Sequence, residues 1–497
     1  MPQRIFDNPS FSRKFNYRYV AKMMGFLCTM QVPFLVIAIL ISLYYHDAGL
    51  QPLEITAGLM AVVGLLLLFI GRNAKDYNAG RREGMLSVAV SWFVVSLIGM
   101  LPYLLGDFVP TFADAFFETI SGFTTTGGTI LTDIEALPRS ILFWRSVTQW
   151  VGGIGIVVFV VALVPIMGGS ASLLYNSETT GVTHERFLPR VGMMAKWVSL
   201  IYVGLSMLCV LLLWAGPMGL YDAVCHATTC ISTGGFSPRN ASIAAYDSFY
   251  IQVITVIFML CGATNFSLLY FALRGRGAKL FTDVEFRAFL AIIGVLTLIA
   301  SLFLFFKGVK PTLFEAVWGA FYHIVSIITS TGYVLDDYNN WYPFFSFVML
   351  FAMFVGGCAG STSGGLKVAR FIILGKNLRN EFHKRTHPNA MLPVRIDGHP
   401  IPGKVVHQVL AFFFAYLCLM MIGAVIVSMD GFTVEESISA ALTSISNTGP
   451  GIGTFGPVNN FASLSSHSKI LLSVIMVMGR LEIFTVLTII LPSFWRS

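Results

Sequence analysis

The sequence predicts an all-α polytopic membrane protein with ten transmembrane helices, a pair at the N-terminus followed by four similar helix–short helix–helix repeats. Three observations lead to this fold class. Of the 497 residues, 56% are hydrophobic and 11% are charged, whereas soluble domains average about 25% charged residues. Apolar stretches that can cross a hydrocarbon core of about 30 Å recur along the whole chain. Between them, a short pattern that ends in Thr-Gly occurs four times.

The apolar stretches define ten spans. The first two, 24–45 and 55–71, form an N-terminal hairpin, and the other eight are 84–105, 140–167, 194–214, 250–273, 288–306, 342–374, 405–427 and 470–491. The loop 46–54 has neither Lys nor Arg, whereas Arg72, Lys75, Arg81 and Arg82 follow the second span. Because basic residues collect on the cytoplasmic side, both termini are expected in the cytoplasm.

Charge and repetition divide the chain further. The net charge is +7, and because the charges fall mainly between the spans, they favour a membrane over a nucleic acid as the partner. We expect an N-terminal segment and hairpin over 1–83, then pore repeats over 84–170, 171–274, 275–376 and 377–497. The third repeat is expected to contain an intramembrane loop.

The four Thr-Gly segments predict re-entrant pore helices, so that each repeat is M1–pore helix–M2 around one pore. The predicted K⁺ filter residues are Thr125, Thr126, Gly127, Ser232, Thr233, Gly234, Ser330, Thr331, Gly332, Asn447, Thr448 and Gly449. Acids stand at or just before the helix starts, namely Asp114, Asp222, Glu315, Glu435 and Glu436. The opposite, C-terminal ends carry partial negative charge that can stabilise a cation in the membrane.

The chemistry of these segments favours K⁺. Glycine allows backbone angles that turn successive carbonyl groups toward an axis, where they can replace the hydration shell of an ion. None of the four segments contains an acid, and divalent ions usually require carboxylate ligands. Acids just beyond the glycines, Asp133, Glu135, Asp336 and Asp337, either concentrate cations at the mouth or form a solvated loop face.

A gate is predicted in the span 342–374, because glycines near its middle weaken the helix by about 1 kcal/mol each. The predicted gate residues are Gly357, Gly360, Ser361, Thr362, Gly364, Gly365, Lys367 and Arg480. Irregular backbone at membrane depth must face protein or a water-filled cavity. The alternatives are that Lys367 extends to the cytoplasmic surface and that Arg480 pairs with Glu482 or another acid.

Other function classes have weaker signals. A membrane enzyme would use His226, His323 and Ser326, but no acid completes either group. Cys225, His226 and Cys230 lack a fourth zinc ligand at the usual spacing. Gly451–Gly456 matches G-x-G-x-x-G without a βαβ unit around it. A carrier of organic solutes would need several broken helices, and only one clear break is visible.

Nearly the whole chain resembles the TrkH/TrkG/KtrB superfamily of potassium uptake proteins. Besides the four pore segments, the resemblance rests on the motifs that begin at Gln149, Gly356, Asn447 and Gly479, and on the additional N-terminal pair of helices. It implies K⁺ uptake across the bacterial cytoplasmic membrane, restricted by the intramembrane loop together with Arg480. Whether transport is passive or coupled to Na⁺ or H⁺, as in a symporter, stays open.

The resemblance also implies partners. These are a second copy of the chain, giving a homodimer with one pore per subunit, and a cytoplasmic nucleotide-binding subunit of the TrkA type. We expect no cofactor in this chain, so ATP/ADP or NAD(H) would bind to that subunit. It would dock on the basic loops near Arg276 and Lys384.

Overall fold

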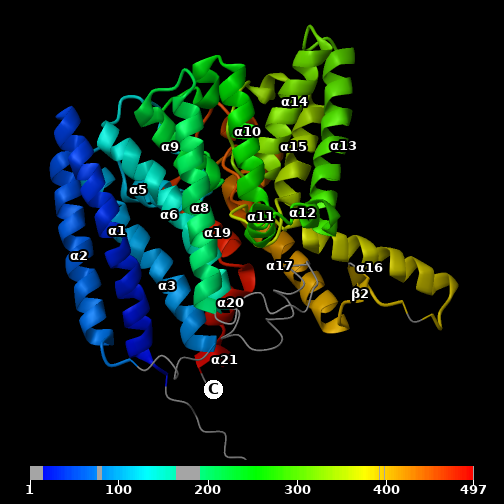
Figure 1. Ribbon diagram of the computed structural model, residues 1–497, viewed down its shortest axis with the longest axis horizontal. Coiled ribbons are helices and arrows are strands. Elements are labelled where there is room, and N and C mark those ends of the chain that lie inside the picture. The colour runs from blue at the N-terminus through cyan, green and yellow to red at the C-terminus, as the bar shows by residue number, and fades with distance from the viewer. Residues whose placement is uncertain (1–14, 75–80, 164–190, 391, 397, 496–497) are drawn as a thin grey trace, which may run out of the picture.

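The structure is a computed structural model that describes residues 15–74, 81–163, 191–390, 392–396 and 398–495. In these ranges the regular structure is helical, except for the two-residue strands β1 (Arg395–Ile396) and β2 (His399–Pro400), which pair antiparallel. Figure 1 shows the helices as one bundle, with the start of α1 and the C-terminal α21 (Pro492–Trp495) at the same end.

The predicted N-terminal hairpin is present as α1 (Tyr17–Tyr45) and α2 (Leu50–Gly71), at the left of Figure 1. The two helices approach closely, because a Cβ atom on Gly25 would lie 2.8 Å from the carbonyl oxygen of Gly64. Small residues permit such contacts between membrane helices. The outer faces of both helices expose large apolar side chains, as expected for contact with lipid.

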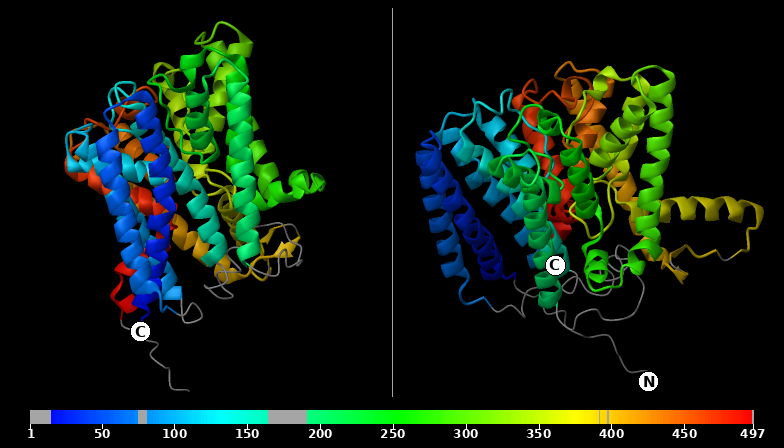
Figure 2. Two further views of the ribbon diagram at one scale, coloured as in Figure 1. Left: turned by 60° about the vertical axis from the view of Figure 1, so that its left-hand side comes forward. Right: turned by 45° about the horizontal axis from the view of Figure 1, so that its top comes forward.

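Four similar helical units follow the hairpin (Figure 2). The first consists of α3 (Arg81–Gly99), α4 (Leu101–Leu105), α5 (Phe112–Phe123) and α6 (Arg139–Leu163). The second contains α8 (Val191–Trp214), α9 (Leu220–Ile231), α10 (Phe249–Ala263) and α11 (Phe266–Leu273), followed by the short α12 (Ala278–Thr282).

The third unit comprises α13 (Val284–Phe306), α14 (Leu313–Ile328), α15 (Pro343–Val355) and α16 (Val368–Thr386). The fourth consists of α17 (Gly403–Ser428), α18 (Val434–Ser446), α19 (Ser466–Arg480) and α20 (Ile483–Ile490). In every unit a helix of 12 to 16 residues comes after the long first helix, and these four helices are α5, α9, α14 and α18. The third unit differs in that α16 extends sideways from the bundle in Figures 1 and 2.

Six described helices are long and apolar enough to cross a membrane: α1, α2, Arg82–Leu105, α8, α13 and α17. Two bent pairs, α10 with α11 and α19 with α20, bring this number to eight when each pair is taken as one span. The predicted span 140–167 corresponds to α6, and its last four residues lie outside the described ranges.

The predicted spans 250–273 and 470–491 are each divided by a sharp bend that the sequence analysis did not predict. The helix axis turns by 111° between α10 and α11 and by 116° between α19 and α20. At the first break Thr264 is extended and Asn265 caps α11 by accepting a hydrogen bond from Ser267 N at 2.8 Å. At the second, Glu482 has a left-handed backbone with φ of 63°, which ends a helix. Asn265 and Glu482 are polar residues within these mainly apolar runs.

The break predicted within 342–374 is present. Helix α15 ends at Val355 and α16 begins at Val368, and we call residues 356–367 the intramembrane loop. Four of its residues have left-handed backbones: Gly356, Gly360, Gly365 and Lys367. Three of the four are glycines, which adopt this conformation without a steric penalty.

Candidate ion-conduction site

The four short helices α5, α9, α14 and α18 are each followed by the same backbone sequence. A left-handed residue comes first, at Thr125, Thr233, Ser330 and Asn447, with φ between 52° and 57°. Two residues later a left-handed glycine follows, at Gly127, Gly235, Gly332 and Gly449, with φ between 76° and 94°. Since few non-glycine residues adopt positive φ, four recurrences at one spacing indicate one structural motif.

This backbone pattern corrects the register predicted for the second repeat. The left-handed glycine there is Gly235, whereas the Thr-Gly pattern selected Gly234. Gly234 is equivalent to Thr126, and Ser232 is the C-cap residue of α9, one position before the segment. The error arose because two glycines are adjacent in this repeat and the sequence does not indicate which has positive φ.

The four segments form a closed ring. A Cβ atom added to each left-handed glycine would lie within 2.8 Å of a carbonyl oxygen of the next repeat. The distances are 2.0 Å from Gly127 to Gly234, 1.7 Å from Gly235 to Thr331, 2.6 Å from Gly332 to Thr448 and 2.8 Å from Gly449 to Thr126. We call these four glycines the glycine ring. Only glycine fits such approaches without displacing backbone.

Side chains of the segments mostly brace the backbone. The hydroxyl groups of Thr126, Thr331 and Thr448 each lie 2.7–2.8 Å from a hydroxyl group at the end of their own short helix. Asn447 donates to the Thr126 hydroxyl at 2.9 Å and thereby joins the fourth segment to the first. The Thr125 hydroxyl is buried and has no hydrogen-bond partner among the described residues.

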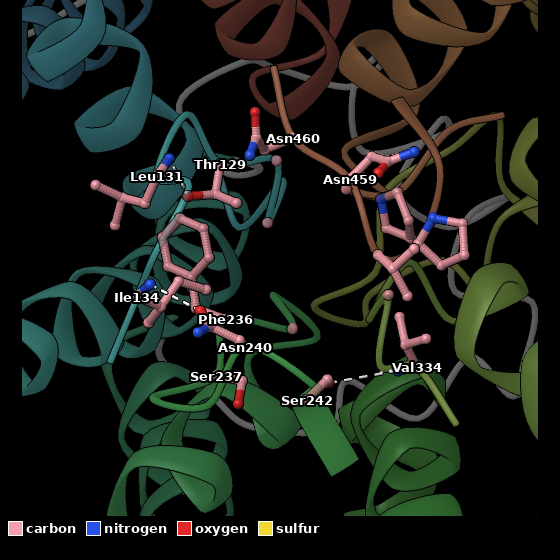
Figure 3. Close-up of a pocket in the computed structure, with 18 of the residues that line it drawn as sticks. Thr129, Leu131, Ile134, Phe236, Ser237, Asn240, Ser242, Val334, Asn459 and Asn460 are labelled. Atoms are coloured by element: carbon pink, nitrogen blue, oxygen red, sulfur yellow. Dashed lines mark hydrogen bonds between the residues drawn. The ribbon is translucent and has the colours of Figure 1, made fainter. Parts of the chain in front are cut away.

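One cavity opens above the ring, on the side away from the C-terminus. Its lining includes all four members of the glycine ring, together with residues of the following loops such as Thr129, Asn240, Asn459 and Asn460 (Figure 3). Its described lining contains no Asp or Glu. The acids predicted at the mouth instead bind neighbours: Asp133 accepts from Asn240 at 2.9 Å, and Asp336 pairs with Lys310 at 2.8 Å.

Three buried polar residues lie behind the ring. Each stands nine residues before the ring glycine of its own repeat. Glu118 accepts hydrogen bonds from the Thr129 hydroxyl and from Ile130 N. His226 contacts the Ser237 hydroxyl at 3.1 Å, and His323 Nε2 accepts from Leu335 N and Asp336 N at 3.4 and 3.3 Å. Each therefore holds the extended segment that follows the ring glycine of its own repeat. Both histidines thus have a structural explanation.

Glu118 also forms a buried ion pair that the sequence analysis missed. Arg145 of α6 lies 2.7 Å from its carboxylate, and the two side chains are 2% and 0% exposed. Arg145 also donates to the Ser237 carbonyl at 3.0 Å and lies 3.5 Å from the centre of the Phe236 ring. The pair therefore connects the irregular segments that follow the first and second ring glycines.

Gln149 of α6 contacts the second segment directly. Its amide nitrogen donates to the Gly234 carbonyl at 2.8 Å, and its amide oxygen accepts from Phe236 N at 3.0 Å. The side chain is fully buried. The motif that begins at Gln149 was noted in the sequence, but its contact with the ring depends on long-range packing.

The intramembrane loop lies directly against the opposite side of the ring segments. The Ser363 hydroxyl is 2.8 Å from the Ser330 hydroxyl, and Gly364 N donates to Ser330 Oγ at 2.9 Å. The Thr362 hydroxyl donates to the carbonyls of Ile231 and Gly262. The loop thus contacts the ends of two short helices at the side where their carbonyl groups emerge.

Arg480 joins this loop to two other units. Its guanidinium donates to the Thr362 carbonyl and, at 3.4 Å, to the Gly152 carbonyl of α6. It does not pair with Glu482, which lies 2.6 Å from Arg370. The Lys367 ammonium donates to the Ser363 carbonyl within the loop itself. The predicted gate residues are therefore brought together around residues 362–364.

The residues that suggested a membrane enzyme, a zinc site or a dinucleotide-binding motif are not arranged for these functions. The Ser326 hydroxyl donates to the Tyr333 carbonyl at 2.7 Å, as expected of a brace behind the ring. Among the described residues, no group of three or more His, Cys, Asp and Glu side chains could hold a metal ion. The segment that matches G-x-G-x-x-G contains the short helix η4 (Gly453–Phe455) beside the cavity.

Comparisons with known proteins agree with this architecture. The model of the TrkH family, described as cation transport protein, matches residues 55–496. The Trk system potassium uptake protein TrkH of Escherichia coli K12 is 35% identical over 485 residues, covering 97% of this chain and 100% of that protein. TrkI of Halomonas elongata is 36% identical, with coverages of 82% and 83%.

A solved structure is also similar. The crystal structure of the potassium transporter TrkH from Vibrio parahaemolyticus superposes with a TM-score of 0.88 at 33% identity, over 97% of this chain and 100% of that one. Sequence similarity and fold similarity both extend over nearly the full length of the two chains. The chain therefore belongs to the TrkH family of cation transport proteins.

Proposed function

We propose that this chain carries K⁺ across the bacterial cytoplasmic membrane through the glycine ring. The observation that carries the proposal is the cyclic set of contacts in which each ring glycine lies against a carbonyl group of the next repeat. Relatives of this chain are named potassium uptake proteins, and the matching crystal structure is titled a potassium transporter. The function is therefore transport rather than enzymatic catalysis.

The electrostatics of the ring suit a monovalent cation. The C-terminal ends of α5, α9, α14 and α18 point to the ring segments, and their carbonyl groups carry partial negative charge. The acids Asp114, Asp222, Glu315, Glu435 and Glu436 lie in the first turns of these helices, where they stabilise the opposite end of the dipole. Uncharged carbonyl oxygens can replace the hydration shell of K⁺ without the carboxylates that divalent ions require.

The intramembrane loop and Arg480 form the proposed gate. The loop crosses beneath the ring, where Ser363 and Gly364 contact Ser330. The Arg480 guanidinium brings a positive charge to Thr362 of the same loop, and such a charge raises the barrier for a cation. In this proposal, movement of the loop opens the path.

The remaining elements of the proposal concern assembly. We propose a homodimer with one pore per subunit, both termini in the cytoplasm, and regulation by a nucleotide-binding subunit of the TrkA type. The word "system" in the names of the relatives supports further components. The basic side chains of α16, which include Lys376, Arg379 and Lys384, offer a cytoplasmic surface for an acidic partner.

Rb⁺ uptake into liposomes that hold the purified chain tests this function. External K⁺ should suppress Rb⁺ uptake, whereas equal Na⁺ should leave most of it. Equal suppression by both ions, or no uptake with and without the regulatory subunit, would overturn the proposal. Repeating the assay with an imposed Na⁺ or pH gradient at fixed membrane potential distinguishes passive conduction from Na⁺- or H⁺-coupled symport.

A further inference from the structure

The carboxylate of Glu285 lies against both the intramembrane loop and the start of α16. Glu285 belongs to the first turn of α13 and is 2% exposed. Its Oε1 atom accepts hydrogen bonds from Ala359 N at 2.7 Å and from Ala369 N at 3.1 Å. The Oε1 atom of Glu285 thus contacts both the loop, at Ala359, and the start of α16, at Ala369.

The helix after the loop depends on this carboxylate for its N-terminal cap. Lys367 occupies the N-cap position of α16, and its side chain forms no capping hydrogen bond. Its backbone is left-handed, with φ of 78°. Helix N-termini need acceptors for their free amide groups and favour negative charge. Glu285 of α13 supplies such an acceptor at Ala369, the second residue of α16.

The other side of the loop is held by the break between α10 and α11. Cys358 N donates to the Ala263 carbonyl at 3.0 Å, and Phe266 N donates to the Gly360 carbonyl at 3.2 Å. Ala359 lies between these two contacts in the chain and binds Glu285 instead. The loop is therefore fixed between two units, and Glu285 is its attachment on the α13 side.

We propose that Glu285 is the positioning residue that holds the intramembrane loop beneath the glycine ring. Burial of a polar group is unfavourable unless the group is hydrogen-bonded, and here Oε1 accepts from two amide groups that belong to the loop and to the start of α16. Loss of these two bonds removes the attachment of the loop to α13 and loosens it, although contacts such as Gly360 with Phe266 and Ser363 with Ser330 remain. This inference rests on the proposed gate, which it deepens by naming the attachment.

The test combines two measurements on Glu285→Ala. Loss of two hydrogen bonds shifts an equilibrium about tenfold or more, so Rb⁺ uptake should rise about tenfold with the Rb⁺/Na⁺ preference unchanged. The second readout is thiol labelling of Cys358, which is fully buried in the loop, in a variant whose other cysteines are replaced. Labelling should become about tenfold faster as well.

Two controls are available within the chain. Glu285→Gln keeps the acceptor oxygen and should label at an intermediate rate. Glu54→Ala removes an exposed carboxylate of α2, outside the four repeats, and should change neither readout. If Glu285→Ala leaves the labelling rate of Cys358 at the parental value, the positioning role is wrong, whatever the transport result.

A double variant separates this inference from the gate itself. In a chain with a shortened intramembrane loop, Glu285→Ala should give no additional flux, because the element it positions is gone. Additional flux in that background would overturn the positioning role. If shortening the loop has no effect on flux, the proposed gate fails, while the labelling result still decides whether Glu285 holds the loop.

Discussion

Gly235 lies so close to Thr331 that a Cβ atom on the glycine would be 1.7 Å from the threonine's carbonyl oxygen. The same residue has φ of 76°, a conformation that costs other residues about 1–2 kcal/mol. Two independent constraints therefore require glycine here. Equivalent contacts at the other three ring positions mean that a distortion at one segment is passed to its neighbour.

Gly235→Ser should reduce the preference for Rb⁺ over Na⁺ by about tenfold, since the backbone strain alone amounts to about 1–2 kcal/mol. The measurement is Rb⁺ uptake with Na⁺ competition. Gly308→Ser is a matched control, because Gly308 also has positive φ, 68°, but nothing lies within 4 Å of its added Cβ atom. Equal selectivity in the Gly235 and Gly308 variants would contradict the ring.

The sequence predicted much of this site because its signals are local. The four Thr-Gly segments, the acids at the helix starts and the glycine-rich break after Val355 all lie within short windows. The adjacent pair Gly234-Gly235 left the register ambiguous by one residue, since φ is not visible in sequence. The breaks at Asn265 and Glu482 lie within long runs that are mainly apolar, and hydropathy averages over the few polar residues in them.

Contacts between distant units could not be predicted from one sequence. Glu118 and Arg145 are 27 residues apart, and Gln149 reaches a segment 85 residues away. Nothing in the local pattern distinguishes these polar residues from side chains that pack within their own helix. Glu285 lies just before the span predicted over 288–306, and only the folded loop gives its carboxylate a partner.

Gln149→Leu should reduce the preference for Rb⁺ over Na⁺, because it removes both hydrogen bonds that hold the Gly234 carbonyl and Phe236 N. Each bond is worth about 1 kcal/mol, so a several-fold change is expected. Gln31→Leu, at a buried glutamine of α1 outside the four repeats, serves as the control. The same change in both variants would mean that the effect is general destabilisation.

Glu118→Ala should destabilise the protein by about 3–5 kcal/mol, because it leaves the Arg145 charge buried without its partner. The free energy of unfolding in detergent is the measurement. Replacing both partners by apolar residues, Glu118→Leu with Arg145→Met, should cost less than the single change. Glu381→Ala breaks an exposed pair with Lys384 and should lie within about 1 kcal/mol of the parent.

Arg480→Gln should increase Rb⁺ uptake by the chain without its regulatory subunit. The substitution removes a buried positive charge that lies beneath the ring and donates to the carbonyls of Thr362 and Gly152, and a cation in the path is repelled by that charge. Arg480→Lys keeps the charge and should retain low uptake.

Arg370→Gln is the matched control for position 480. Arg370 lies on α16, pairs with Glu482 at 2.6 Å and stacks 4.0 Å from the centre of the Phe412 ring, so its charge is neutralised away from the loop residues 362–364. Uptake by this variant should stay near the parental value. If Arg480→Gln folds, binds Rb⁺ with the parental preference and yet conducts no faster, the arginine is a structural tie between α19, the loop and α6, and the barrier to K⁺ lies in the loop backbone alone.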